Sequence, residues 1–203
     1  MNYLQENPFI AILRGLQPAQ AVAVGSLLYE AGLRVIEVPL NRKNALESIR
    51  LLKDTLPSDC LIGAGTVVTN QQLDSLIELD IKLVVSPNTN KTLIQKANDH
   101  KMISMPGFMS PTEAYNAYES GARMLKLFPA ASLGVNHLKA VLSILPDDVG
   151  VIAVGGVDPS NAHLWLEAGA IGLGIGNSLF SQGDSYQTSK EKVFAFNKAI
   201  NFE

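Results

Sequence analysis

Apolar residues along this 203-residue chain gather into short runs that alternate with segments of helical spacing. The runs cover residues 8 to 13, 34 to 40, 60 to 65, 82 to 87, 101 to 106, 123 to 129, 150 to 156 and 170 to 176. Each run is continuous rather than alternating, which is typical of strands buried on both faces. The pattern therefore predicts eight buried strands.

The segments between these runs carry apolar residues at spacings of three and four, which predicts amphipathic helices. Proline near a helix start and glycine just after its end are the expected boundary signals. The prolines at such starts are Pro18, Pro111 and Pro159, and the glycines at such ends are Gly32, Gly121 and Gly169. The last segment, 185 to 200, predicts a closing helix.

Eight strand-helix units call for a parallel sheet with both faces covered, and eight such units close naturally into a (β/α)8 TIM barrel. An open doubly wound sheet is the alternative for this α/β pattern. The length fits one domain, residues 1 to 203. Because the chain is shorter than the roughly 250 residues usual for this barrel, we expect no large lid and a small substrate.

Composition narrows the classes of partner. The net charge is −3 and lysines and arginines form no stripe, so we expect no nucleic-acid partner. No apolar run reaches the roughly 18 residues that span a bilayer, and the first residues do not resemble an export signal. The only cysteine, Cys60, has no partner for a disulfide. We expect a cytoplasmic protein that contacts no membrane.

Lys126 is the most informative residue, because it lies within an apolar run between Leu125 and Leu127. Active sites of TIM barrels lie at the carboxyl ends of the strands. Burial there disfavours the ammonium form and yields a nucleophilic amine, which attacks ketones to form a Schiff base. Glu37 likewise interrupts an apolar run and suits proton transfer. The alternative is a structural ion pair of Lys126 with Glu37.

Glycines cluster where the last two strands end, at residues 153 to 157 and 172 to 178. In this fold the loops there commonly bind phosphate through backbone N–H groups. This predicts a phosphate site at Gly155, Gly156, Gly176 and Asn177, the alternative being glycines that only relieve crowding at tight turns. Arg14, Thr66 and Asn88 follow the first, third and fourth strands. We expect no metal or other cofactor, since no metal-ligand motif is present.

The chain resembles the 2-keto-3-deoxy-6-phosphogluconate (KDPG) and 6-phosphogalactonate (KDPGal) aldolases. The residues that carry the resemblance span nearly the whole chain: AILRG at 11 to 15, IEVPLN at 36 to 41, IGAGTV at 62 to 67, SPN at 86 to 88, PG at 106 to 107, LKLFPA at 125 to 130, AVGGV at 153 to 157 and GLGIGNS at 172 to 178. Together, in this order and spacing, they are highly specific.

The resemblance implies a class I aldolase and carbon-carbon lyase that acts on pyruvate and a phosphorylated keto-deoxy sugar acid. It implies that Lys126 forms the Schiff base and that Glu37 is the general acid/base. Arg14, Thr66 and Asn88 would bind the carboxylate or hydroxyl groups. By the same likeness the glycines at 155, 156 and 176, with residue 177, hold the phosphate. The family also implies a homotrimer.

Two positions favour the galactonate branch of this family. The gluconate branch usually has arginine four residues after the catalytic glutamate and glycine after the SP of the fourth strand, whereas this chain has Asn41 and Asn88. The alternatives are the gluconate epimer or both epimers as substrate. More remote are a phosphate-binding barrel isomerase and a catalytically idle barrel, although neither requires a strand lysine together with Glu37.

Overall fold

Parallel strands form one sheet at the centre of the protein, in a computed structural model that describes residue 4 and residues 7–200. The strands are β1 (Phe9–Ile12), β2 (Val35–Pro39), β3 (Leu61–Gly65), β4 (Leu83–Val85), β5 (Ile103–Met105), β6 (Gly107–Phe108), β7 (Met124–Leu127), β8 (Gly150–Val154) and β9 (Gly172–Ile175). Their order in the sheet is β5-β4-β3-β2-β1-β9-β8-β7-β6. Every pairing is parallel, as the continuous apolar runs predict.

The sheet closes into a barrel through its fifth strand. Only Pro106 separates β5 from β6, the two strands at the ends of the order. Proline has no N–H group, so the regular ladder is interrupted there. The Pro106 carbonyl nevertheless accepts a 2.9 Å hydrogen bond from the Lys126 N–H. β5 and β6 are therefore halves of one strand, and the predicted eight-stranded TIM barrel is confirmed.

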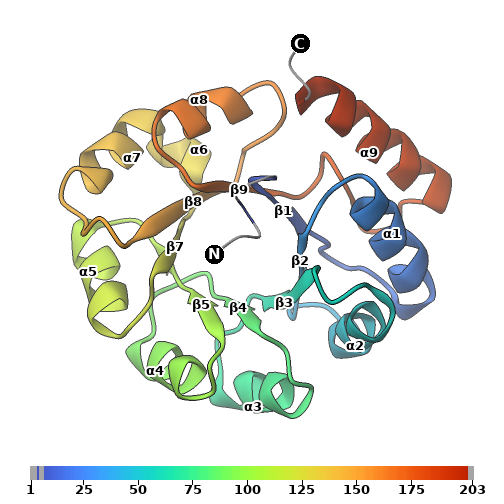
Figure 1. Cartoon of the computed structure of the whole chain (residues 1–203), viewed down its shortest axis with the longest axis horizontal. Helices are drawn as coiled ribbons and strands as arrows, with labels where there is room; N and C mark the ends of the chain where they lie inside the picture. Colours follow the sequence, from blue (N-terminus) through green and yellow to red (C-terminus); the bar gives the residue numbers. More distant parts are fainter. Residues whose placement is uncertain (1–3, 5–6, 201–203) are drawn as a thin grey trace.

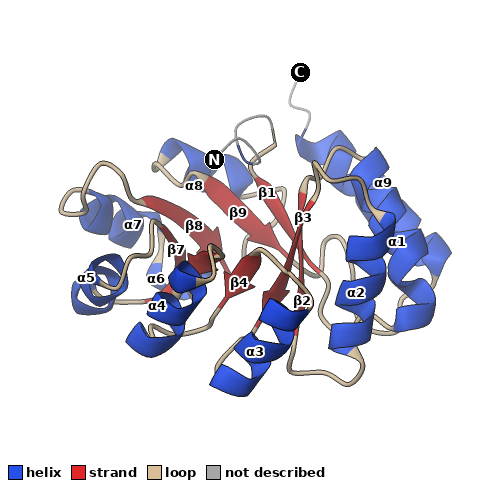
Figure 2. Ribbon diagram, turned by 60° about the horizontal axis from the view of Figure 1, so that its bottom comes forward, coloured by secondary structure: helices blue, strands red, loops and turns tan. Residues whose placement is uncertain are grey.

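Helices surround the barrel on its outer side (Figure 1). They are α1 (Pro18–Glu30), α2 (Ala45–Thr55), α3 (Asn70–Glu78), α4 (Lys91–Asp99), α5 (Pro111–Glu119), α6 (Ala130–Leu133), α7 (Val135–Leu142), α8 (Ala162–Glu167) and α9 (Tyr186–Ile200). Figure 2 shows them flanking the strands, with α9 beside α1. Within the described residues, no helix is both long and apolar enough to cross a membrane.

The predicted helix boundaries are confirmed at most positions. Pro18 and Pro111 occupy the first turn of α1 and α5, whereas Pro159 lies in the loop three residues before α8 begins. The three glycines that follow helices have φ values between +91° and +103°, which only glycine adopts easily: Gly32, Gly121 and Gly169. These turns lead each helix back to the next strand.

Two apolar clusters stabilise the fold. The larger one lies between the sheet and the helices and includes Leu125 and Leu127 of β7. The smaller one fills the barrel interior and includes Ile12, Met124 and Val154. Since side chains alternate along a strand, Lys126 points into the barrel with Met124, between two leucines that point outward. The inner cluster forms the floor of a cavity at the carboxyl ends of the strands.

Candidate active site

A cavity of about 490 Å³ lies at the carboxyl ends of the strands. Its lining comes from the ends of β1, β2, β3, β7, β8 and β9 and the loops that follow them. The predicted site residues that line it are Arg14, Glu37, Thr66, Lys126, Gly155, Gly156, Gly176 and Asn177. The barrel thus brings together residues that are up to 163 positions apart in the sequence.

Asn88 does not line this cavity. It is exposed in the loop after β4, and its backbone N lies beside Gly107 of β6. Asn41, the other position that favours the galactonate branch, is also exposed and outside the cavity lining, in the loop after β2. The position of a residue directly after a strand predicts that it lies at the rim of the barrel. It does not predict whether the side chain reaches the cavity.

Lys126 is buried on β7, with a relative exposure of 7%. Burial lowers the pKa of its ammonium group, and the Arg14 guanidinium lowers it further, while the Glu37 carboxylate opposes both effects. The Nζ atom lies 4.9 Å from the centroid of the Phe128 ring. A larger fraction of Lys126 is therefore the free amine than for a lysine on the surface.

Glu37 is buried on β2, with a relative exposure of 2%. Burial raises the pKa of its carboxyl group to about 7, although the positive charges of Lys126 and Arg14 lower it. Its Oε2 atom has no hydrogen-bond partner among the described residues. A carboxyl group with a pKa near 7 both donates and accepts protons at neutral pH.

Lys126 and Glu37 lie on opposite sides of the barrel, because β1, β9 and β8 separate their strands. Their charges interact, but no ion pair within 4.0 Å joins them in the described part of the chain. The structural alternative, an ion pair linking the two strands, is not formed. Both groups instead face the same cavity.

Arg14 and Thr66 lie at the mouth of the cavity. Arg14 is exposed, and its charge influences both buried ionisable groups. Thr66 is half-buried and has a φ of +56°, a conformation that β-branched residues rarely adopt. Such strain concentrates at functional sites, where the surrounding structure maintains it.

The glycine-rich loops form the other end of the cavity. Gly155 and Gly156 have φ values of +96° and +76°, and a Cβ at residue 156 would lie 2.4 Å from the Ala131 Cβ. After β9, the Gly176 carbonyl accepts hydrogen bonds from the N–H groups of Leu179 and Phe180, at 2.9 and 3.0 Å. These bonds define one helical turn. The first N–H groups of such a turn have no carbonyl partner within it and are free to bind a ligand. Asn177 and Ser178 occupy that position at the cavity.

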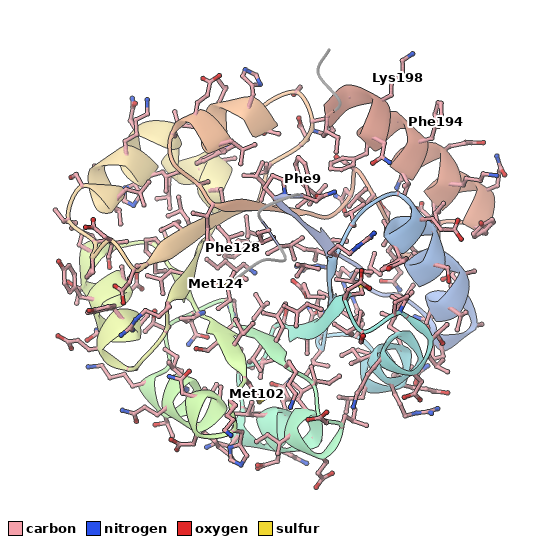
Figure 3. All side chains as sticks on the ribbon, viewed as in Figure 1. Phe9, Met102, Met124, Phe128, Phe194 and Lys198 are labelled. Carbon is pink, nitrogen blue, oxygen red and sulfur yellow. The ribbon has the colours of Figure 1, made fainter. Side chains whose placement is uncertain are left out.

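Sequence reasoning missed several residues that line the cavity: Ile12, Phe128, Val154, Val157, Asp158 and Gly174. Phe128 had a usable signal, since it follows Lys126 by two positions and alternation places both on the same side. Figure 3 shows Phe128 within the ring of strands. Asp158 accepts hydrogen bonds from the Ser160 N–H and O–H, which lower the pKa of its carboxyl group.

The sequence profile of the KDPG and KHG aldolase family matches residues 1–195. This chain belongs to that family. The chain is 39% identical to the 2-dehydro-3-deoxy-6-phosphogalactonate aldolase of Escherichia coli (strain K12), over 98% of its length and 97% of the relative's. It is 28% identical to the KHG/KDPG aldolase of the same organism, over 91% and 85%. The protein is therefore an aldolase, a carbon-carbon lyase.

A solved structure of the family supports the same assignment. The native KDPGal structure superposes with a TM-score of 0.92 at 39% identity, covering 98% of this chain and 97% of that one. The barrel is thus shared over almost the entire length of both chains. Among the described residues, no group of three or more His, Cys, Asp and Glu is placed to bind a metal ion.

Proposed function

We propose that this protein is a class I aldolase that reversibly cleaves 2-dehydro-3-deoxy-6-phosphogalactonate to pyruvate and D-glyceraldehyde 3-phosphate through a Schiff base on Lys126. One observation carries the proposal: a buried lysine with a lowered pKa and a buried carboxyl group with a pKa of about 7 face one cavity without forming an ion pair. Perturbed groups of this kind in a cavity are typical of catalytic sites.

The first step requires the free amine of Lys126. The amine attacks the C2 carbonyl of the substrate and forms a carbinolamine. Glu37, protonated in part at neutral pH, donates a proton to the departing oxygen, which leaves as water and gives a protonated imine. The positive charge on the imine nitrogen then attracts the electrons of the C3–C4 bond.

Cleavage follows from that charge. Glu37, now a carboxylate, removes the proton of the C4 hydroxyl, directly or through water. The C3–C4 electron pair moves toward the imine nitrogen, the C4 carbonyl forms, and D-glyceraldehyde 3-phosphate leaves. The remaining enamine takes up a proton at C3, and hydrolysis of the imine releases pyruvate and restores Lys126. No metal or other cofactor is needed, since the imine accepts the electrons.

The two ends of the cavity suit the two ends of this substrate. Arg14 supplies a positive charge and Thr66 a hydroxyl group in the cavity that Lys126 also lines, so we assign the substrate carboxylate and hydroxyl groups to them. Asn88 lies outside the cavity lining, so its assignment to the same task rests on the resemblance to the family alone. The phosphate would lie against Gly155, Gly156, Gly176 and Asn177, where backbone N–H groups are available.

The galactonate epimer is the proposed main substrate. The chain is 39% identical to a curated KDPGal aldolase but 28% identical to a KHG/KDPG aldolase from the same organism. Asn41 and Asn88 agree with that branch. A site that satisfies a hydroxyl group in one orientation leaves a polar group unpaired with the other epimer, which costs about 1–3 kcal/mol.

Steady-state cleavage of both epimers, followed by pyruvate detection in the presence of EDTA, tests this assignment. We expect kcat/KM to be roughly 5- to 150-fold higher for the galactonate epimer, with measurable activity on the gluconate epimer. EDTA should leave both rates unchanged. Equal kcat/KM values would contradict the epimer assignment, and restoration of an EDTA-sensitive activity by a divalent ion would contradict the Schiff-base mechanism.

We also propose the domain organisation, the assembly, the location and the partners of the chain. Residues 1–203 would form a single catalytic domain, since the barrel uses strands and helices from one end of the described chain to the other. The chain would assemble as a homotrimer in the cytoplasm. Its partners would be small molecules, pyruvate and the phosphorylated keto-deoxy sugar acid, and not nucleic acid or a membrane.

A further inference from the structure

We propose that Gly65 is a positioning residue, whose missing side chain determines where the Glu37 carboxyl group lies. This inference rests on the proton-transfer role proposed above for Glu37. A Cβ atom at residue 65 would lie 1.9 Å from Oε2, 2.5 Å from Cδ and 2.7 Å from Oε1 of Glu37. These separations are far below van der Waals contact. Any larger residue at position 65 therefore excludes the carboxyl group from its present place.

The backbone around Gly65 has little freedom to relieve this overlap. The Gly65 carbonyl accepts a 2.8 Å hydrogen bond from the Leu40 N–H on the β2 side. On the β4 side, the Val67 N–H donates to the Val85 carbonyl at 3.1 Å, and the Ser86 hydroxyl donates to the Val67 carbonyl at 2.7 Å. With β3 held from both sides, the Glu37 side chain is the part that must move.

The Glu37 carboxyl group depends on packing for its orientation. Its Oε2 atom has no hydrogen-bond partner in the described structure, although it is buried. No strong directional bond to that atom therefore fixes the group, and the space left by Gly65 is what accommodates it. General acid/base catalysis needs the carboxyl oxygen within about 2.6–3.2 Å of the proton it transfers, so a displacement of about 1 Å matters.

Gly65→Ala should therefore reduce proton transfer more than imine formation. Lys126 lies across the barrel from β3, and the three atoms nearest to the new methyl group all belong to Glu37. We expect kcat for cleavage to fall roughly 100-fold, within the range attributed to general acid/base groups, while KM changes only a few-fold. Pyruvate with borohydride should still label Lys126.

Gly63→Ala provides a matched control on the same strand. Its new Cβ would lie 2.7 Å from the Cβ, Cγ and Cδ2 atoms of Leu83, so the three atoms that it meets first belong to an apolar side chain and not to Glu37. We expect kcat to stay within a few-fold of the wild-type value. Wild-type turnover in Gly65→Ala, or an equal loss of kcat in Gly63→Ala, would overturn the positioning role.

A double-mutant cycle in Tm, with variants at residues 37 and 65, keeps the test decisive if Gly65→Ala folds poorly. Glu37→Ala removes the carboxyl group and leaves room for the methyl group at residue 65. Gly65→Ala should therefore lower Tm in the wild type but change it little in the Glu37→Ala background. If the double variant is as destabilised as the single one, the overlap with Glu37 is not the cause and the inference fails.

The two proposals fail in different ways. Absence of pyruvate labelling at Lys126 in the wild type would contradict the proposed function. The stability cycle needs no catalysis, and so a lack of coupling between residues 37 and 65 would contradict the inference alone.

Discussion

At the scale of single residues, the free energy of burying Glu37 depends on pH. The carboxyl group has a pKa of about 7 in the folded protein, because burial disfavours its charge, against a usual value of 4.5. Between these values the folded state binds more protons than the unfolded state. The free energy of unfolding should therefore decrease as pH rises from about 4.5 to 7, by on the order of 3 kcal/mol at most.

Glu37→Gln tests this dependence, since the amide does not ionise. The wild type should lose stability relative to the variant as pH rises through that window. Thermal unfolding of both proteins at pH 5 and at pH 8 measures this change. The Tm of the variant minus the Tm of the wild type should be larger at pH 8 than at pH 5. Parallel behaviour at both pH values would show that Glu37 has an ordinary pKa.

The same variant tests catalysis. Without an ionisable group at residue 37, kcat should fall roughly 100-fold or more, while pyruvate still forms some imine with Lys126. Steady-state kinetics and borohydride labelling of the same preparation separate the two steps. Turnover close to that of the wild type would return Glu37 to a purely structural role.

Sequence reasoning found the charged residues of this site because a charge within an apolar run is costly and so conspicuous, as at Lys126 and Glu37. It did not find Gly65 or Asp158. The significance of Gly65 depends on the Glu37 carboxyl group, which the fold brings close to it. Asp158 lines the cavity only because the barrel places the loop after β8 there. It placed Asn88 at a strand end, but the side chain lies outside the cavity lining.

At the scale of elements, the junction between β3 and α3 contains a strained residue of the cavity. Thr66 has a φ of +56°. Thr66→Gly should remove strain of about 1–3 kcal/mol, offset in part by about 0.5–1 kcal/mol of added chain entropy in the unfolded state. We expect stability to be retained or slightly raised, while kcat/KM falls because the hydroxyl group is lost.

Thr66→Ser is the matched control for that variant. It keeps the hydroxyl group and removes only the β-branch, so kcat/KM should remain near the wild-type value. Denaturant unfolding and steady-state kinetics on both variants give the two readouts. A clear loss of stability in Thr66→Gly would show that the conformation is not strained, and an unchanged kcat/KM would show that the hydroxyl does not contact substrate.

The elements themselves were largely predictable, since apolar periodicity marks buried strands and one-sided helices directly. The exceptions arose at residues that interrupt a ladder or a helix. Pro106 divides the fifth strand into β5 and β6, and Gly134, with a φ of +82°, separates α6 from α7. Periodicity identifies a run of apolar residues but not a local break in its hydrogen bonds.

At the scale of the whole molecule, the family resemblance predicts three copies of the chain. The outer surface carries exposed apolar side chains, and Figure 3 shows one of them, Phe194, projecting outward from α9, with 71% of its surface exposed. Light scattering should give three times the chain mass of 21.8 kDa. A mass of one chain would contradict the trimer but would leave the proposed chemistry intact.

The number of strand-helix units was enough to predict a closed barrel, because eight units close naturally in this fold. The cavity was less accessible to prediction. Its lining joins Arg14 of the first unit to Asn177 of the last, and only closure of the barrel brings them together. Its volume depends on how far Ile12, Phe128 and Val154 extend into the space, which periodicity does not encode.

Covalent trapping of pyruvate is the most direct test of the central claim, that Lys126 forms a Schiff base. The protein is incubated with pyruvate and borohydride, which reduces the imine to a stable secondary amine, and the peptides are mapped by mass spectrometry. Lys126→Gln is the control and should remain unlabelled. We expect a single pyruvyl-derived adduct on Lys126. An adduct on another lysine, or none, would contradict the mechanism.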